Sequence, residues 1–197
     1  MKHLIIGLGS KARIGKDYAA QELAKLFDVQ RIAFADALKL DIADIVARHG
    51  LDYWAIEKQP ELKEKIRPLL VEYGMTMRRF NEDVWVDRAL APGNLTSEVI
   101  LVTDVRFPNE AKRIRELGGH YIEIMTNTPP INETEAYYSP LMAESAEYTI
   151  KNNFDPEFIP DLVNLVFNLW KLTQSKESVH TRSTGESTSL NTLTLKR

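Results

Sequence analysis

The spacing of hydrophobic residues changes repeatedly between two patterns along this chain. Residues 4–8 and 99–103 are short, continuous apolar runs, which are typical of β-strands buried on both faces. Elsewhere apolar residues recur every three or four positions, as Ala20, Leu23 and Phe27 do, which indicates a helix with one buried face. Strands that alternate with helices predict an α/β protein in three layers, with a parallel sheet covered by helices on both faces.

The other elements follow the same alternation. Short strands are predicted at residues 31–34, 121–124 and 148–150, and helices at residues 36–46, 60–74, 107–117 and 158–172. Asp36 is expected to cap the first of these helices, Pro68 to kink the second and Gly74 to end it. The polar, proline-containing stretch of residues 126–140 is predicted to be a loop or a lid.

The composition is that of one soluble domain. The chain has 197 residues, 44% of them hydrophobic, and a formal net charge of −3. Because it has no cysteine, disulfides, cysteine-ligated zinc and cysteine nucleophiles are excluded. No apolar run approaches the roughly 20 residues of a membrane helix, and the N-terminus does not read as a signal peptide. We therefore expect a cytoplasmic protein that acts on neither membranes nor nucleic acid.

Residues 173–197 differ from the rest of the chain, since serine and threonine dominate and aromatic residues are absent. So polar a segment buries too little surface to offset its ordering entropy. We predict a folded domain of residues 1–172 followed by a disordered tail.

The turn after the first predicted strand carries the clearest chemical motif. Residues 9–18 join this strand to a helix, with Gly15 and Lys16 at the helix start, which is the context of a P-loop. Backbone N–H groups at such a helix N-terminus, together with a lysine ammonium, favour a bound phosphate. Asp17 stands where the general motif has serine or threonine, and its carboxylate is a suitable oxygen ligand for Mg²⁺. The alternative interpretation is an ordinary glycine-containing turn with a surface lysine.

Basic residues later in the chain are candidates for holding a second phosphate, because arginine matches phosphate through paired hydrogen bonds. The candidates are Lys39, Arg67, Arg78, Arg79 and Arg106. Each of them has an ordinary alternative as a solvated surface cation.

Three further residues complete the predicted acceptor site. Asp104 directly follows a strand, which suits a carboxylate that acts on Mg²⁺ or its water shell, or else one that caps the next helix. Trp85 is a candidate for stacking on a base, or for packing in the core. Glu110, one turn beyond Arg106, forms with it either a pair that reads phosphate or base, or a surface salt bridge.

Together these motifs resemble the deoxynucleoside monophosphate kinases of bacteriophages, a branch of the P-loop nucleoside monophosphate kinases. The resemblance covers residues 3–170 and is most specific at residues 104–110, Asp-Val-Arg-Phe-Pro-Asn-Glu. Asp17 is itself typical of that family. The resemblance implies a P-loop kinase-like fold and transfer of the γ-phosphoryl group of ATP, with Mg²⁺, to a deoxynucleoside monophosphate for DNA synthesis. It also implies a host cytoplasm as the location, and it leaves a homodimer open.

Motifs and resemblance together define the candidate site. The ATP-binding residues are Lys11, Ala12, Arg13, Ile14, Gly15, Lys16, Asp17 and Tyr18, and the acceptor-binding residues are Lys39, Arg67, Gly74, Arg79, Trp85, Asp104, Arg106 and Glu110. Lys16, Arg13, Asp17 and Arg106 are the candidate catalytic residues, with Asp17 and Asp104 as ligands of Mg²⁺.

The chain departs from that family at several positions. Ser10 replaces the first loop glycine, Tyr18 stands where threonine is usual, residues 132–135 lack a histidine, and no lid arginine follows Ile124. Two other functions therefore stay open. One is a P-loop kinase for another small acceptor such as dephospho-coenzyme A, against which residues 104–110 argue. The other is a nucleotide-binding protein without turnover, which Tyr18 and the missing lid arginine favour.

Overall fold

Five parallel strands form the middle layer of the part of the chain that the structure describes. This computed structural model describes residues 3–9, 11, 14–152, 154 and 156–185, with side chains as far as residue 175. The strands are β1 (Leu4–Gly9), β2 (Val29–Ile32), β3 (Val99–Val102), β4 (His120–Met125) and β5 (Tyr148–Lys151), in the order β2-β3-β1-β4-β5. Each pair of neighbours is parallel. The predicted α/β fold is confirmed.

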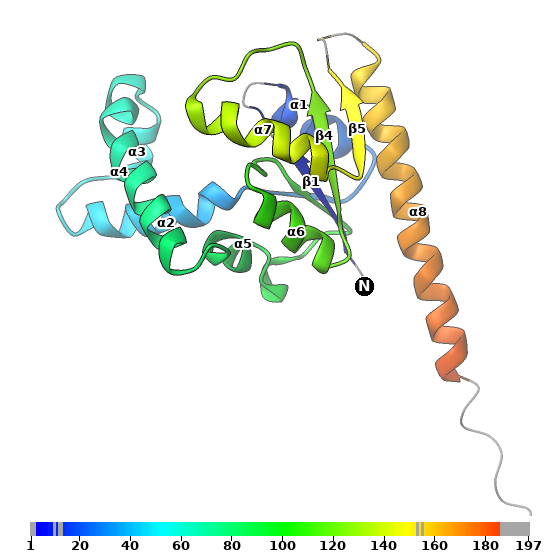
Figure 1. The fold of residues 1–197 in the computed structure, drawn as a ribbon. Helices are drawn as coiled ribbons and strands as arrows, with labels where there is room; N and C mark the ends of the chain where they lie inside the picture. The colour runs from blue at the N-terminus through cyan, green and yellow to red at the C-terminus, as the bar shows by residue number, and fades with distance from the viewer. Residues whose placement is uncertain (1–2, 10, 12–13, 153, 155, 186–197) are drawn as a thin grey trace, which may run out of the picture.

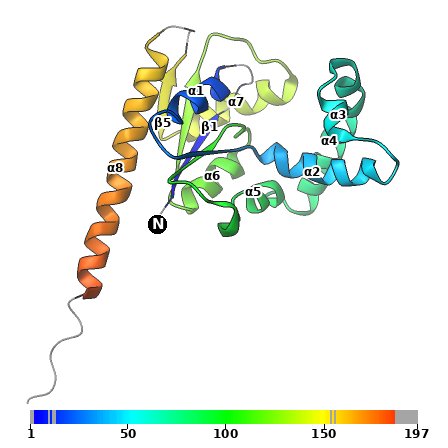
Figure 2. The same cartoon turned by 180° about the vertical axis from the view of Figure 1, so that it is seen from behind.

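Helices cover both faces of this sheet (Figures 1 and 2). They are α1 (Lys16–Leu23), α2 (Phe34–Ala47), α3 (Tyr53–Glu57), α4 (Pro60–Phe80), α5 (Val84–Ala89), α6 (Pro108–Glu116), α7 (Glu133–Ser145) and α8 (Phe158–Gly185), with a short 3₁₀ turn, η1 (Pro92–Asn94). Helices α1 and α8 pack on one face, and α5, α6 and α7 on the other. The strands β1 and β3 are buried at every position because both faces are covered.

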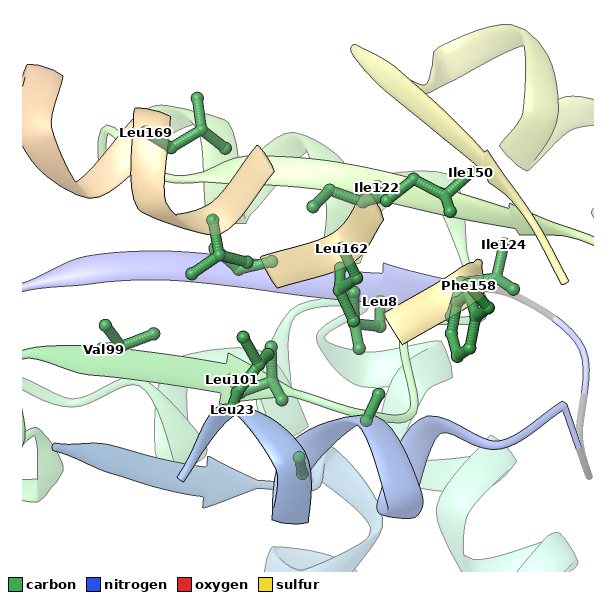
Figure 3. Packing of buried hydrophobic residues seen from close by; sticks show 14 of the residues in the cluster. Leu8, Leu23, Val99, Leu101, Ile122, Ile124, Ile150, Phe158, Leu162 and Leu169 are labelled. Carbon is green, nitrogen blue, oxygen red and sulfur yellow. The ribbon is translucent and has the colours of Figure 1, made fainter. Parts of the chain in front are cut away.

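The core under α8 shows why these elements stay together. Figure 3 shows Leu8 and Ile122 of the sheet beside Leu162 of α8, and Leu101 of the sheet beside Leu23 of α1. All five side chains are buried, with exposed fractions of 3% or less. Burying one such side chain stabilises the fold by roughly 1.5–3 kcal/mol, so this face alone is a large favourable contribution.

Helices α2, α3 and α4 form an arm that extends away from the sheet (Figures 1 and 2). The arm has a small core of its own, in which Ile42, Val46 and Tyr53 are buried against Ile66 and Tyr73. This arrangement places one side of α4 opposite the ends of the strands, where it forms a wall of the site described below.

Several predicted element boundaries were wrong. Helix α4 continues past Gly74 to Phe80, since Gly74 is buried against Leu38 instead of ending the helix. Pro68 lies inside that helix. Helix α2 begins at Phe34, so Asp36 lies within its first turn and is not its cap.

The predicted loop at residues 126–140 contains the start of helix α7. Its first turn is capped by Asn132, whose side-chain oxygen accepts a hydrogen bond from the Glu135 backbone N–H at 2.8 Å. The last helix is also longer than predicted, because α8 continues beyond Leu172 to Gly185. The first part of the predicted disordered tail is therefore helical, and residues 186–197 lie outside the described residues.

Candidate active site

The phosphate loop begins where β1 ends at Gly9 and leads into α1. Gly15 has the left-handed φ of 79° and is the N-cap of α1, and as a glycine it has no side chain that could cap the first turn. Among the described residues no side chain accepts from the N–H groups of that turn, which suits them to bind an anion. The Asn152 amide donates to the Ile14 carbonyl at 2.9 Å and fixes the loop from the β5 side. Ser10, Ala12 and Arg13 lie outside the described residues.

Lys16 is the central cation of this loop. Its ammonium group is largely buried, and this burial, followed by the nearby charge of Arg106, lowers its pKa from 10.5 to about 8. The carboxyl groups of Asp104, Glu123 and Glu135 act in the opposite direction. The Lys16 ammonium donates to the Lys11 carbonyl. Lys16 is therefore held within the loop, close to several charges from other elements.

Lys11 is anchored to the segment that follows β4, because its ammonium donates to the Thr128 carbonyl at 2.8 Å. Lys11 also lines a small cavity of about 280 Å³ together with Glu123 and Ser139. The first predicted loop lysine thus connects the phosphate loop to the region before α7.

A larger cavity, of about 410 Å³, lies between α4, α7 and the segment after β3. A cavity of this size suits a small-molecule ligand. It brings together six of the predicted acceptor residues: Arg67, Gly74, Trp85, Asp104, Arg106 and Glu110. Sequence reasoning did not include Phe34, Phe107, Glu135 or Tyr138, which also line the cavity.

Two predicted acceptor residues do not line this cavity. Lys39 forms an ion pair with Glu57 at 2.9 Å. Burial alone would lower the pKa of Lys39, but the hydrogen bond to Glu57 and its negative charge outweigh that effect and raise the pKa. Arg79 is exposed, and its neighbour Arg78 lines the cavity instead. Of these two neighbouring candidates, Arg78 is the one that the cavity includes.

Arg78 is held by several partners and not by charge alone. Its guanidinium lies 3.9 Å from the centre of the Phe107 ring. It donates to the Glu82 carbonyl and to Asn109 Oδ1, each at 3.0 Å, and lies 3.5 Å from Glu110 Oε1. Arg78 and Phe107 together form a stacked wall of the cavity.

Two carboxyl groups organise the cavity's polar end, of which Asp104 is half-buried and Glu110 buried. Asp104 accepts hydrogen bonds from the Phe34 and Ala35 backbone N–H groups, at 2.8 and 2.9 Å, and thereby caps α2. Glu110 accepts from the Arg106 and Phe107 backbone N–H groups, at 2.7 and 3.0 Å, and caps α6. Burial raises the pKa of Asp104, and it raises the pKa of Glu110 to about 8. The predicted cap role of Asp104 is thus found, although at α2 and not at the helix ahead.

Trp85 packs in the core, which is one of the two roles weighed for it, and its stacking on a base stays a prediction. Its ring is buried, and its Nε1 donates to the Gly74 carbonyl at 3.2 Å, which ties α5 to α4. The same side chain lines the cavity.

The predicted ligands of Mg²⁺ have different surroundings. Asp17 is exposed, and its carboxylate accepts a hydrogen bond from Arg31 Nε at 2.8 Å. Tyr18 is also exposed, at 55%. Asp104 lines the cavity, and its charge acts to raise the pKa of Lys16. Within the described residues, no three histidine or acidic side chains lie where they could hold a metal ion together. Mg²⁺ usually needs only one or two carboxylates besides phosphate oxygens, and Asp104 fits such a site better than Asp17.

No helix among the described residues has the length and apolarity needed to span a membrane.

Comparisons with known proteins add to this geometry. No curated protein matches the sequence. Solved structures that resemble the fold include shikimate kinase from Bacteroides thetaiotaomicron, with 14% identity over 85% of this chain and 98% of that one and a TM-score of 0.47. Dephospho-CoA kinase from Campylobacter jejuni shares 14% identity over 86% and 98% of the two chains, with a TM-score of 0.44. The tunicamycin resistance protein of Deinococcus radiodurans shares 12% identity over 83% and 95%, with a TM-score of 0.43.

The sequence profile described as phosphomevalonate kinase matches residues 8–120, which is more than half of the chain. The matched stretch begins in β1, includes the phosphate loop and the arm, and ends at the start of β4. With its P-loop at the end of the first strand of a parallel sheet, the chain belongs to the phosphomevalonate kinase family of phosphotransferases.

Proposed function

We propose that this protein transfers the γ-phosphoryl group of ATP to the phosphate of a deoxynucleoside monophosphate. One observation carries the proposal. The cavity next to Lys16 combines cations at one side, Arg67 and Arg106, with aromatic walls that include Phe107 and Trp85. An acceptor with a phosphate and a flat ring matches both features.

The phosphate of the acceptor fits beside Arg106. This side chain is exposed in the cavity, and among the described residues it makes no hydrogen bond or ion pair. Its charge lowers the pKa of Lys16, so the two cations face a shared region. Donor and acceptor phosphates that meet there would be neutralised from both sides, which is the main requirement of phosphoryl transfer. An acceptor phosphate is already an anion, so no general base is needed.

The base of the acceptor fits the aromatic part of the cavity. The stacked Arg78 and Phe107 side chains offer a flat surface there. Tyr138 extends it, since its ring packs edge to face against Phe107 with the ring centres 4.9 Å apart. Glu110 lies at the same wall with a raised pKa, so its carboxyl group is able to donate as well as accept a hydrogen bond. Such a group could read the edge of a base.

ATP and Mg²⁺ complete the proposal. The uncapped first turn of α1, with Gly15 and Lys16, would hold the donor phosphates. Asp104 would contact Mg²⁺ or its water shell, and the ion would neutralise charge on the transferred group.

Phosphomevalonate is a second candidate acceptor, because the family profile carries its name. Its chemistry fits the cavity less well. Phosphomevalonate has a carboxylate in addition to its phosphate, and the cavity is lined by the carboxyl groups of Asp104 and Glu135. A second anionic group would meet these side chains, whereas a neutral base would not.

A panel of acceptors tests the proposal. The four common deoxynucleoside monophosphates, phosphomevalonate and dephospho-coenzyme A are each supplied with ATP and Mg²⁺, and ADP release is measured. We expect release with at least one deoxynucleoside monophosphate and a loss on the order of a thousandfold in Lys16→Ala. Release with phosphomevalonate or dephospho-coenzyme A alone would assign the acceptor to that class. ATP binding without any transfer would identify a nucleotide-binding protein instead.

A further inference from the structure

The segment between β4 and α7 has few contacts with the core. Figure 1 shows it as the loop that arches from the end of β4 to the start of α7. None of residues 126–134 is buried, and the next buried side chains are those of Glu135 and Met142 within α7. A segment with so few buried contacts opens at little free-energy cost unless other contacts hold it. Its position therefore depends on polar contacts with the rest of the molecule.

Lys11 of the phosphate loop supplies such a contact. Its ammonium donates a hydrogen bond of 2.8 Å to the carbonyl of Thr128, which lies 117 positions further along the chain. A hydrogen bond from a charged donor is stronger than one between neutral groups, and this one is partly buried. Within the described part of the chain, the other hydrogen bonds of residues 126–131 are local, such as that from the Thr128 N–H to Thr126 Oγ1. Lys11 is thus the long-range anchor of the segment.

Local hydrogen bonds connect this anchored segment to the wall of the larger cavity. The Ile131 N–H donates to Glu135 Oε2 at 2.9 Å, and the Asn132 side-chain oxygen accepts from the Glu135 N–H at 2.8 Å. The residues of this region that line the cavity are Asn132, Thr134, Glu135, Tyr138 and Ser139. The chain that Lys11 holds at Thr128 therefore continues directly into one wall of the proposed acceptor site.

The main chain of Lys11 contacts the other half of the site. The Lys16 ammonium donates to the Lys11 carbonyl. Lys11 thus touches the lysine of the proposed donor site through its backbone and the acceptor wall through its side chain. A change at the phosphate loop when ATP binds acts on the residue that holds the segment after β4.

We infer that Lys11 is a positioning residue that fastens the segment after β4 to the phosphate loop, so that bound ATP fixes the wall of the acceptor cavity. The loop motif groups Lys11 with the residues expected to hold ATP, and this inference gives its ammonium a different partner, the Thr128 carbonyl. The role rests on the proposed function in that the phosphate loop binds ATP and the larger cavity binds the acceptor.

Hydrogen–deuterium exchange tests this role. Backbone exchange in peptides that cover residues 126–138 is measured for the wild type, Lys11→Met and Lys11→Arg, each alone and with Mg²⁺ and AMP-PNP, an ATP analogue that is not hydrolysed. Lys11→Met keeps an unbranched side chain and removes the donor. We expect it to speed exchange in these peptides roughly tenfold, as for loss of one hydrogen bond to a charged group.

The response to the analogue separates coupling from mere structural support. In the wild type AMP-PNP should slow exchange of residues 126–138, and in Lys11→Met it should not. Lys11→Arg keeps the charge and N–H donors and should restore both behaviours. Wild-type exchange in Lys11→Met, a full response of that variant to AMP-PNP, or no response in the wild type would overturn the inference.

The affinity for AMP-PNP distinguishes this role from direct binding of phosphate. Lys11→Met should weaken that affinity less than about threefold in isothermal titration calorimetry, since no contact with the donor phosphates is removed. A loss of about tenfold or more with unchanged exchange at residues 126–138 would make Lys11 a ligand of ATP and overturn the inference. Lys25→Met is the matched control, because Lys25 is an exposed lysine paired with Glu22 at 2.7 Å. It should change neither the exchange nor the affinity.

The exchange experiment needs no acceptor. If the acceptor panel gives no transfer while residues 126–138 respond to AMP-PNP through Lys11, the proposed reaction fails and the positioning role stands. If transfer is observed but Lys11→Met exchanges as the wild type does, the positioning role fails and the proposed reaction stands. With an acceptor from the panel, Lys11→Met should raise the KM for the acceptor roughly tenfold and the KM for ATP less than about threefold.

Discussion

The buried carboxyl group of Glu110 makes the stability of this protein depend on pH. Its pKa rises from 4.5 in the unfolded chain to about 8 in the folded one, chiefly because burial disfavours the charged form. A group whose pKa is higher in the folded state contributes stability that is complete below the unfolded pKa and is lost as the pH rises through the folded value. The stability owed to protonated Glu110 should therefore decrease between pH 4.5 and pH 8.

Glu110→Gln isolates this contribution. Glutamine keeps the shape of the side chain and an oxygen that accepts the Arg106 and Phe107 backbone N–H groups, but it does not titrate. The rise of the pKa from 4.5 to about 8 corresponds to a loss of at most roughly 5 kcal/mol in the free energy of unfolding, at about 1.4 kcal/mol for each pKa unit. The pKa of about 8 already includes the effect of the hydrogen bonds to the carboxylate, and a difference in the free energy of unfolding of about 2 kcal/mol is readily measured.

The assay is urea unfolding of the wild type and of Glu110→Gln at pH 5, 6, 7 and 8. The free energy of unfolding of the wild type should fall relative to that of the variant at each step. Other titrating groups are common to both proteins, so their contributions cancel in the difference. Parallel stability curves, or a wild type that gains stability relative to the variant as the pH rises, would refute the reasoning.

Three further predictions follow from single side chains. Asp104→Ala should destabilise the fold by about 1–2 kcal/mol in urea unfolding, because the first turn of α2 loses its cap, and Asp104→Asn should lose less. Gly9→Ala should lower the free energy of unfolding by about 1–3 kcal/mol through overpacking. Gly93→Ala should change it little, because an added Cβ there meets nothing within 4 Å. Equal effects of the two substitutions would contradict the close approach of the Tyr121 ring to Gly9. Arg78→Ala should raise the KM for the acceptor at least tenfold in a steady-state assay, because it removes the stacked wall of the cavity. Arg79 is exposed, so Arg79→Ala should leave this KM unchanged in the same assay.

The fold was largely predictable because its central strands are buried on both faces. Such strands read as continuous apolar runs, as residues 4–8 and 99–103 do, and the helices between them carry clear apolar faces. Helix α7 was missed for the opposite reason. Its apolar residues are spread around the helix, and Pro140 lies within it, so neither spacing nor composition indicated a helix there.

The sequence did not show which of Arg78 and Arg79 faces the cavity, because the helix was predicted to end at Gly74. Once the helix continues to Phe80, Arg67, Gly74 and Arg78 share one face, since they are separated by whole numbers of turns. Arg79 is rotated away from that face. The signal was present in the spacing, but a glycine that is usually a helix end concealed it.

Partners of long side chains were the part that spacing could not predict. Whether a lysine or an aspartate meets a ligand or another residue depends on contacts between elements far apart in the sequence. Lys39 forms an ion pair with Glu57 of α3, and Asp17 forms one with Arg31 of β2. Neither pair follows from periodicity.

These pairings also indicate which cations would be able to bind the phosphate of the proposed acceptor. The sequence suggested a cluster of many cations, but most of them are engaged in the described part of the structure. Arg78 is fixed by Glu82, Asn109 and Glu110, whereas Arg67 shares an exposed ion pair with Glu64 at 2.7 Å. An exposed pair of this kind is worth at most about 1 kcal/mol, so Arg67 can exchange Glu64 for a substrate phosphate at little cost. Under the proposed function, the acceptor phosphate would bind between Arg106 and Arg67, and Arg78 would hold the wall against which the remainder of the substrate packs.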